Sequence, residues 1–304
     1  MDEQSWQIFQ QQFNPAKKYI LAVSGGVDSV VMLDMMSRVS NLSLEIAHFN
    51  HGIRPNTSQR DADFVKKLAA DYQLPFYGGW SAVGELASED QARQARYRFL
   101  RSLKQTHSNS VICVAHHRDD IVETIALNLV RGTGWRGLAV MGASDVFRPM
   151  LNFTKQQLID YAKSYNLSWY EDETNKSGRY LRNRLRAKIN DRISSDASEL
   201  LIELYQRQSQ LRLAIEAETQ RLITLIHHEE QGFSRYFVIM IDETSARDLL
   251  RAIFMREIGI SLTRPQLDRA VWAIKTAWPS TSAQLGYGIR LNFTRQYWTI
   301  SKTN

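Results

Sequence analysis

The sequence predicts an α/β protein: a parallel sheet with helices on both faces, followed by a long linker helix and a small α+β domain. Short apolar runs at 19–23, 44–49 and 111–115 are typical of buried strands, and patterns typical of helices separate them. Parallel strands need crossover connections, usually helices, so this alternation favours a parallel sheet. The helices expected between the strands begin near Asp28 or cover 61–72 and 91–104.

The second part of the chain has a different pattern. A capping box at 196–199 precedes leucines and isoleucines at helical spacing as far as Ile226, which predicts one long connecting helix. Beyond it we expect a strand at 231–241, helices at 245–258 and 264–277, and a hairpin over 284–300 that turns near 291–295. We therefore expect a catalytic domain at 1–205 and a linker helix with a small accessory domain at 206–304.

Composition limits the class of protein. The 304 residues are 43% hydrophobic and 23% charged, values of a chain with a packed core rather than a disordered or fibrous one. The single cysteine, Cys113, excludes an internal disulfide framework and a thiolate-rich metal site within one chain. The polar segment Met1–Phe13 and the lack of a long apolar run predict a cytoplasmic protein without a membrane span. The net charge of +6 favours a polyanionic partner.

The segment Ser24–Gly25–Gly26–Val27–Asp28–Ser29 lies between the first strand and the first helix of the sheet. Two glycines let the backbone approach a phosphate, while the helix N-terminus and the serine hydroxyls supply hydrogen-bond donors. Asp28 beside a phosphate would be repelled unless a cation lies between them, which implies Mg²⁺. The alternative is a plain strand-to-helix turn in which Ser24 or Asp28 caps the helix.

Three further groups of side chains are candidates for chemistry. His48 and His51 lie at and just after the end of the second strand, where they either shape the loop and contact a nucleotide or bind a metal. Arg93 and Arg96 are three residues apart, on one face of a helix that is either a carboxylate or phosphate site or a solvated surface. The third group consists of acids behind two histidines at the end of the third strand, a position that favours a site over simple helix capping: Asp119, Asp120 and Glu123.

Positive charge is concentrated at 179–192. This segment holds six cations against one anion, Asp191, and is either an RNA-binding strip or an exposed basic helix face. The cations are Arg179, Arg182, Arg184, Arg186, Lys188 and Arg192.

The loop resembles the SGGxDS signature of pyrophosphatase-loop (PP-loop) ATPases, which have an adenine nucleotide α-hydrolase-like, Rossmann-like sheet. Within that superfamily, the ordered motifs over 19–190 resemble those of tRNA(Ile)-lysidine synthetases. They are AHFNHGIR from Ala47, ARQARY from Ala92, AHHRDDIVET from Ala115, and YLRNRLR from Tyr180.

The resemblance implies ATP-dependent ligation of free L-lysine to C2 of the wobble cytidine of a tRNA(Ile) with a CAU anticodon, through an adenylated cytidine. It implies that ATP contacts the loop and the end of the second strand: Ser24, Gly25, Gly26, Val27, Asp28, Ser29, His48, Asn50, His51 and Arg54. It implies catalytic roles for Asp28, Asp119, Asp120, Glu123, Arg93 and Arg96, with Mg²⁺ at Asp28 and Asp119. It implies tRNA contacts at Arg182, Asn183, Arg184 and Arg186.

Three alternatives stay open. A tRNA cytidine thiolase would share the loop but generally needs cysteine pairs. An amidotransferase-type synthetase would need a glutamine-hydrolysing domain. A non-enzymatic tRNA-binding module would not need the loop. Many lysidine synthetases carry one more carboxyl-terminal domain than we identify here. We therefore expect a short form, whose recognition of tRNA is either simpler or shared across a homodimer.

Overall fold

The computed structural model describes residues 2–50, 55–80, 89–132, 135–141, 145–170 and 194–302. The chain divides into two compact units, Met1–Ser209 and Gln210–Asn304, and each is described by itself.

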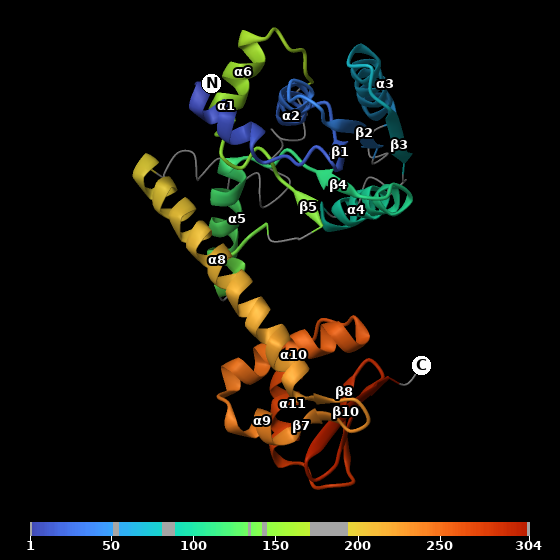
Figure 1. The fold of residues 1–304 in the computed structure, drawn as a ribbon, viewed down its shortest axis with the longest axis vertical. Helices are drawn as coiled ribbons and strands as arrows, with labels where there is room; N and C mark the ends of the chain where they lie inside the picture. Colours follow the sequence, from blue (N-terminus) through green and yellow to red (C-terminus); the bar gives the residue numbers. More distant parts are fainter. Residues whose placement is uncertain are drawn as a thin grey trace. The chain divides into compact units, whose positions relative to one another are not determined.

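A five-stranded sheet forms the centre of the first unit (Figure 1). All of its strand pairs are parallel, and the strand order is β3-β2-β1-β4-β5. The chain adds β2 and β3 on one side of β1 and then crosses back to add β4 on the other side, so the carboxyl ends of β1 and β4 flank a topological switch point. The strands are β1 (Lys18–Ala22), β2 (Ser43–Asn50), β3 (Phe76–Trp80), β4 (Ser110–Cys113) and β5 (Val146–Phe147).

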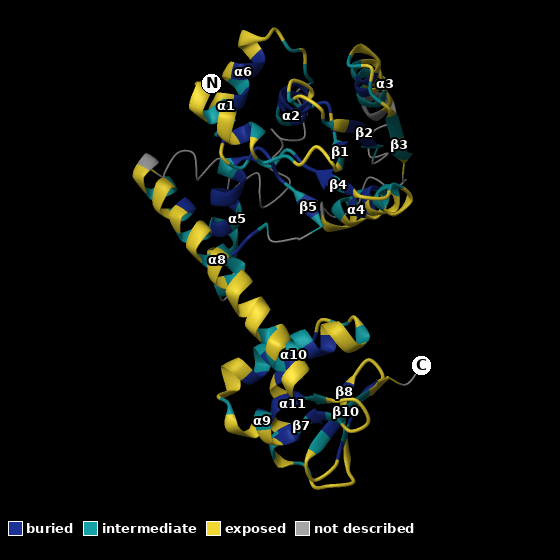
Figure 2. Cartoon of the chain, in the orientation of Figure 1, coloured by how far each residue is buried: buried dark blue, intermediate teal, exposed yellow. Residues whose placement is uncertain are grey.

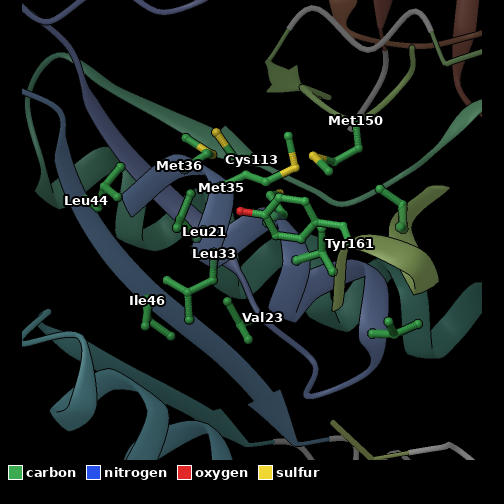
Figure 3. Close-up of a cluster of buried hydrophobic side chains, with 14 of the residues drawn as sticks. Leu21, Val23, Leu33, Met35, Met36, Leu44, Ile46, Cys113, Met150 and Tyr161 are labelled. Atoms are coloured by element: carbon green, nitrogen blue, oxygen red, sulfur yellow. The ribbon is translucent and has the colours of Figure 1, made fainter. Parts of the chain in front are cut away.

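Helices cover both faces of this sheet, so the predicted fold class is confirmed. On one face, a core of side chains from β1, β2 and β4 packs against α1, α2, α3 and α6 (Figures 1 and 3). On the other face, alternate strand residues such as Ile20 and Ile112 pack against α4. The helices are α1 (Glu3–Gln10), α2 (Val27–Ser37), α3 (Pro55–Asp71), α4 (Glu89–Thr106) and α6 (Lys155–Ser164).

Two further helices of the described residues belong to this region. Helix α5 (Arg118–Val130) follows β4 directly, and a 3₁₀ turn, Trp135–Gly137, follows it. Ile121 and Ile125 of α5 form a small core with Ile202, which lies in the first part of the long helix α8 (Ser195–Ile226). The predicted long helix is therefore present.

The buried carboxylate of Asp34 joins three helices on the first face of the sheet. Asp34 lies in α2 and is only 4% exposed. Its oxygens accept hydrogen bonds of 2.7 Å from the hydroxyl of Tyr72, next to the end of α3, and from that of Tyr161 in α6. Arg38 donates to both oxygens, at 2.7 and 3.3 Å. Burial alone would raise the pKa of Asp34, but these hydrogen bonds outweigh it and the pKa is lowered.

The second unit contains a five-stranded sheet of order β6-β7-β10-β9-β8, in which every pair is antiparallel. Its core surrounds the fully buried Trp298 and includes the inward faces of α10 and α11, whose outer faces are exposed (Figure 2). The elements are β6 (His227–His228), β7 (Gly232–Ser234), α9 (Arg235–Met240), α10 (Glu243–Ile258), α11 (Arg264–Thr276), β8 (Ser282–Gly286), β9 (Ile289–Phe293) and β10 (Tyr297–Lys302).

Two expectations for this unit were wrong. The expected strand at 231–241 is a strand only as far as Ser234, whose hydroxyl then caps α9 by accepting from the N–H of Phe237. The buried Arg235 fixes this helix by donating to the carbonyls of Ile274 and Ala277 at the end of α11, a contact that local sequence cannot predict.

The expected single hairpin over 284–300 is instead a three-stranded meander. An additional turn at Tyr287 and Gly288 precedes β9, and both residues have positive φ. Tyrosine is uncommon in that conformation, so the sequence gives little warning of the turn.

We predict that Asp34→Asn lowers the free energy of unfolding by about 1–3 kcal/mol, because buried donors lose their charged acceptor. Since the pKa of Asp34 is lower in the folded protein, its ionised form stabilises the fold above the unfolded-state pKa of about 3.9. This stabilisation is lost as the pH falls below about 4. Urea unfolding at pH 7 and at successively lower pH measures both effects.

The exposed Asp71→Asn is the matched control, and we expect it to change stability by less than about 0.5 kcal/mol. If the difference between the parent and Asp34→Asn did not narrow on acidification, ionised Asp34 would not be the stabilising species.

Candidate active site

The segments that follow β1 and β4 meet at the switch point of the sheet. The first is the loop Ser24–Ser29 and the second is His116–Asp120, which leads into α5. Because β1 and β4 are paired in parallel, these two segments lie at the same edge of the sheet although they are about ninety residues apart in sequence.

The loop has a shape that only glycine suits at its first turn. Gly25 has a φ of +96°, and a Cβ atom there would lie 3.4 Å from the ring of Phe64 in α3. The carbonyl of Gly25 accepts a 3.0 Å hydrogen bond from the N–H of Tyr170, which fixes the loop from its outer side. The conformation therefore depends on glycine and on packing against α3.

Ser29 braces the loop from inside. Its hydroxyl accepts from the N–H groups of Ser24 and Gly25 at 3.2 Å and donates to the carbonyl of Gly26 at 2.9 Å. Ser29 is 4% exposed, so it shapes the loop rather than presenting its hydroxyl to solvent. Gly26 is the N-cap of α2 and has no side chain to satisfy the first N–H groups, which leaves the N-terminus of this helix suited to an anion.

Asp28, in the first turn of α2, forms an ion pair with Lys155. The ammonium of Lys155 lies 2.6 and 2.8 Å from the two carboxylate oxygens. Asp28 therefore does not cap α2, as the plain-turn alternative would have it. Its negative charge is balanced by the first residue of α6, a residue that the motif analysis did not include.

The same lysine connects Asp28 to Asp119. The backbone N–H of Lys155 donates to Asp119 Oδ2 at 2.7 Å, and that oxygen also lies 3.3 Å from His117 Nδ1. On its other side, His117 Nε2 lies 3.6 Å from Asp120 Oδ2 and 3.9 Å from Asp28 Oδ2. We call these five residues the acid–cation cluster: Asp28, His117, Asp119, Asp120 and Lys155.

The cluster favours protonated His117. His117 is only 4% exposed, and burial of its ring would lower its pKa. The hydrogen bond with Asp119 and the charges of Asp120 and Asp28 outweigh burial, so the pKa of His117 is raised. In Asp119, burial would raise the pKa, but His117 and the Lys155 N–H outweigh it and lower the pKa. The cluster thus stabilises opposite charges side by side.

The three acids of the third motif have different surroundings. Asp120 accepts from the N–H of His117 at 3.0 Å and so caps its own helix, whereas the side chain of Asp119 is 46% exposed at the edge of the cluster. Glu123 lies one turn further along α5 and is 4% exposed. Of the three, Asp119 is the most accessible to a ligand.

The end of β2 is fixed to the end of β1 by His48. This buried ring lies with Nδ1 2.9 Å from the carbonyl of Val23, and because a carbonyl only accepts, Nδ1 carries the proton. Burial lowers the pKa of His48 in spite of this hydrogen bond. Neutral His48 then presents Nε2 as an acceptor, and Asn50 at the end of the same strand is partly buried.

Arg93 and Arg96 both lie over one ring of α4. Their guanidinium carbons lie 4.9 and 5.6 Å from the centroid of Tyr97, so the expected common helical face exists. His51, Arg54, Arg182, Asn183, Arg184 and Arg186 lie outside the described residues.

Sequence reasoning did not assign roles to His117 and Lys155, although both belong to the cluster. His117 was quoted within a motif, and its neighbours Asp119 and Asp120 were the available signal. The only sequence pattern around Lys155 is a capping box formed by Thr154 and Gln157, which predicts the start of a helix. It does not predict an ion pair with Asp28, which is 127 residues away in sequence.

The donor set restricts how a metal ion would bind. Within the part of the chain that the structure describes, no group of three or more His, Cys, Asp or Glu residues could hold a metal by itself. Mg²⁺ is commonly held by one or two carboxylates together with substrate phosphates and water, and the partly exposed Asp28 fits that mode.

None of the described helices is long and apolar enough to cross a membrane.

Several known proteins have sequences similar to this chain. The chain is similar to the tRNA(Ile)-lysidine synthases of Caldanaerobacter subterraneus subsp. tengcongensis, with 38% identity over 57% of this chain, and of Wolbachia pipientis wMel, with 38% over 64%. The enzyme of that name from Enterococcus faecalis is 28% identical over 86% of this chain. These alignments span 39%, 48% and 62% of the relatives' own lengths, less than two thirds in each case.

A solved structure of a U34-tRNA thiolase from Methanococcus maripaludis has a similar fold. The TM-score is 0.57, with coverage of 69% of this chain and 78% of that one, and the identity of 16% limits the likeness to the fold. The PP-loop domain family matches residues 1–193, which include both segments of the switch point and the whole acid–cation cluster. Because this match extends over more than half of the chain, the chain belongs to the PP-loop domain family.

Proposed function

We propose that this protein is an ATP-dependent ligase that joins lysine to C2 of the wobble cytidine in the CAU anticodon of a tRNA(Ile). The product would be lysidine, which changes codon recognition from AUG to AUA. The observation that carries the proposal is the placement of the phosphate loop beside the acid–cation cluster at one switch point, in a chain similar to curated tRNA(Ile)-lysidine synthases.

ATP is the nucleotide that the loop and the family support. Its phosphates would lie against the glycines and the N-terminus of α2, where N–H groups and the helix dipole attract an anion. In the first step, the O2 atom of the cytidine attacks the α-phosphorus, pyrophosphate leaves, and AMP is joined to the base. Neutral His48, fixed between β1 and β2, can accept a hydrogen bond beside the nucleotide.

Asp28 would hold Mg²⁺ together with the phosphates of ATP, and the ion would neutralise charge on the leaving pyrophosphate. In the structure, the ammonium group of Lys155 neutralises the carboxylate of Asp28 instead. Asp119 is the second carboxylate near the loop, and one of its oxygens already accepts from the backbone of Lys155. Asp28 is therefore the primary candidate ligand and Asp119 the secondary one.

Free lysine would supply the amine for the second step. Its ε-amine attacks C2 of the adenylated cytidine, AMP leaves, and the amine loses a proton. The exposed carboxylate of Asp119, with Asp120 and Glu123 behind it, suits an ammonium group of the substrate. The arginines of α4, Arg93 and Arg96, can supply positive charge for anionic groups.

The tRNA would contact the basic strip, of which Arg182, Asn183, Arg184 and Arg186 are the proposed contacts. The net charge of +6 supports a nucleic-acid partner. A cytoplasmic location and a homodimer are part of the same proposal, since the substrate tRNA is made in the cytoplasm and a dimer would extend the surface for it.

Thiolation of a tRNA cytidine is the alternative within the same superfamily, and the chain is poorly equipped for it. Cys113 is the only cysteine and is fully buried, and burial raises the pKa of its thiol well above the ordinary value. A thiolate that carries sulfur must be accessible and easily formed. The fold similarity to a thiolase does not change this, because it extends to the fold alone.

The proposal is tested by incubating the protein with ATP, Mg²⁺, labelled lysine and a tRNA(Ile) transcript with a CAU anticodon. We expect label in the RNA, with release of pyrophosphate and AMP. A transcript with a different base at the wobble position is the control and should stay unlabelled. ATP-dependent labelling with a sulfur donor, and none with lysine, would favour the thiolase instead.

We predict that Asp28→Ala lowers the rate of adenylation by at least about 100-fold, because the variant loses a charged contact that acts on the reacting phosphates. The side chain of Asp28 is 30% exposed, so the fold should be retained. Pyrophosphate release and thermal unfolding measure the two effects.

Lys155→Met is the matched variant. If Lys155 only balances the charge of Asp28, saturating Mg²⁺ should hold its adenylation within about tenfold of the parent rate. A folded Asp28→Ala variant with near-parental adenylation would refute the assignment of the loop.

We predict that neutralising Arg182, Arg184 and Arg186 to Gln weakens tRNA binding and flattens its dependence on salt. Each lost phosphate contact should lower the magnitude of the log–log slope by about 0.7–0.9. Binding of tRNA(Ile) measured at several salt concentrations tests this. An unchanged slope would mean that these arginines form a solvated surface.

A further inference from the structure

Helix α3 and the segment 166–170 form the two walls of a groove in the first unit. The groove has a volume of about 930 Å³. It lies behind the phosphate loop, where Phe64 packs against Gly25 and the N–H of Tyr170 donates to the carbonyl of Gly25. Helix α3 lies over β2 and β3 at the edge of the sheet, and the segment 166–170 follows α6 (Figure 1). The reaction proposed above assigns no role to this groove.

Charged side chains line the α3 wall of the groove at helical spacing. They are three or four residues apart, so they form one row along the helix, and positive and negative charges alternate in it: Arg60, Asp63, Lys67 and Asp71. All four residues are exposed, and the guanidinium of Arg60 lies over the ring of Tyr170 at 4.2 Å. A row of this kind is either a solvated helix face or one half of a charged interface.

Apolar groups lie beside this row. Phe64 and Leu68 are partly buried and line the groove from α3, while Leu167 and Tyr170 line it from the other wall. The segment 166–170 contains no charged residue. Protein interfaces commonly combine an apolar centre with a polar rim. An occupant that matches this groove offers apolar side chains together with charges that alternate in the complementary order.

The same face of a second copy has that order. The row reads positive, negative, positive, negative from Arg60 to Asp71, and it reads with the opposite signs when the helix is turned end over end. With a two-fold axis midway between these two residues, Arg60 lies level with Asp71 of the second copy. Asp63 lies within one residue of Lys67 of the second copy, which is about 1.5 Å along the axis. A parallel arrangement would instead bring like charges together.

We propose that this face of α3 binds the same face of a second copy of the chain, in antiparallel orientation about a two-fold axis. The homodimer rests on the proposed function, and this inference adds the surface that forms it. The apolar pair at the centre fits the same axis, because Phe64 also lies within one residue of Leu68 of the second copy. None of the residues of the acid–cation cluster lines the groove, so the interface and that cluster share no residue.

The interface consists of one helix and one short segment from each copy, which is small for a protein–protein contact. We therefore expect weak association, with a Kd on the order of 1–100 μM. Salt screens the attraction between exposed charges, so the Kd should rise at high ionic strength. Sedimentation velocity of the full chain, from about 1 to 300 μM at low and high salt, measures both effects.

Reversal of single charges distinguishes this interface from a solvated helix face. Arg60→Glu and Asp71→Lys each place like charges opposite each other twice in the symmetric dimer, so each should raise the Kd by at least about tenfold. A mixture of the two variants brings opposite charges together at both positions, and we expect it to form a one-to-one heterodimer with about the Kd of the parent. Within one chain, residues 60 and 71 are about 16.5 Å apart along the helix, beyond the screening length of about 8 Å. Restoration in the mixture can therefore arise only between chains.

Lys66→Glu is the matched control, because Lys66 is an exposed residue of α3 that does not line the groove. We expect its Kd to stay within about threefold of the parent's. Thermal unfolding of each variant checks that the fold is retained, and restored association in the mixture is a second check, since unfolded chains could not provide it.

Three results would overturn the proposal. The first is a parent chain that stays monomeric over the whole concentration range. The second is a dimer that neither charge reversal weakens, which would use another surface. The third is loss of the dimer in both variants without restoration in their mixture. These measurements use no lysine, ATP or tRNA, so a chain that associates in this way but ligates no lysine would refute the proposed function alone.

Discussion

The site depends on one topological constraint, the crossing of the chain from β3 to the far side of β1. Only because β4 pairs with β1 do the loop at Ser24–Ser29 and the histidines at 116 and 117 lie at one edge of the sheet. The helices that follow these strands, α2 and α5, begin at this edge, so their N-termini and first-turn acids lie there too. The next strand, β5, pairs with β4 and delivers Arg148 and, through α6, Lys155 to the same place.

Negative and positive groups lie close together in the acid–cation cluster. Asp28, Asp119 and Asp120 surround a buried imidazole and a lysine, so each acid has a nitrogen base within 4 Å. A nucleotide that enters brings additional negative charge to the loop, which disturbs this balance and creates a demand for a cation. Of the two nitrogen groups that approach Asp28, Lys155 is the more accessible, with a side chain 41% exposed, whereas His117 is buried.

The sequence was sufficient to predict the features that are local. The strand-loop-helix pattern around Ser24–Ser29 and the histidine–acid segment after β4 each lie within a few residues, so their residue types and the family resemblance identified them as candidates. Lys155 could not be found in this way, because its ion pair with Asp28 forms only when α6 packs beside α2. The segment after Gly232 was assigned wrongly for a related reason: its apolar run fits a strand or a helix, and Arg235, bound to the end of α11, decides between them.

Two buried arginines show why burial alone does not identify a site. Arg235 is 6% exposed and Arg148 is 7% exposed, so their burial is equivalent. The guanidinium of Arg235 donates to the carbonyls of Ile274, Ala277 and Thr294, and its charge is compensated by the end of a helix, whose dipole is negative. Arg148 instead donates to a histidine ring and one carbonyl and lies beside another arginine. Among the described residues, the first guanidinium is thus surrounded by carbonyl oxygens, whereas the second has a ring nitrogen, one carbonyl and a second cation as neighbours. The groups that surround the guanidinium, rather than the depth of the side chain, therefore distinguish the two arginines.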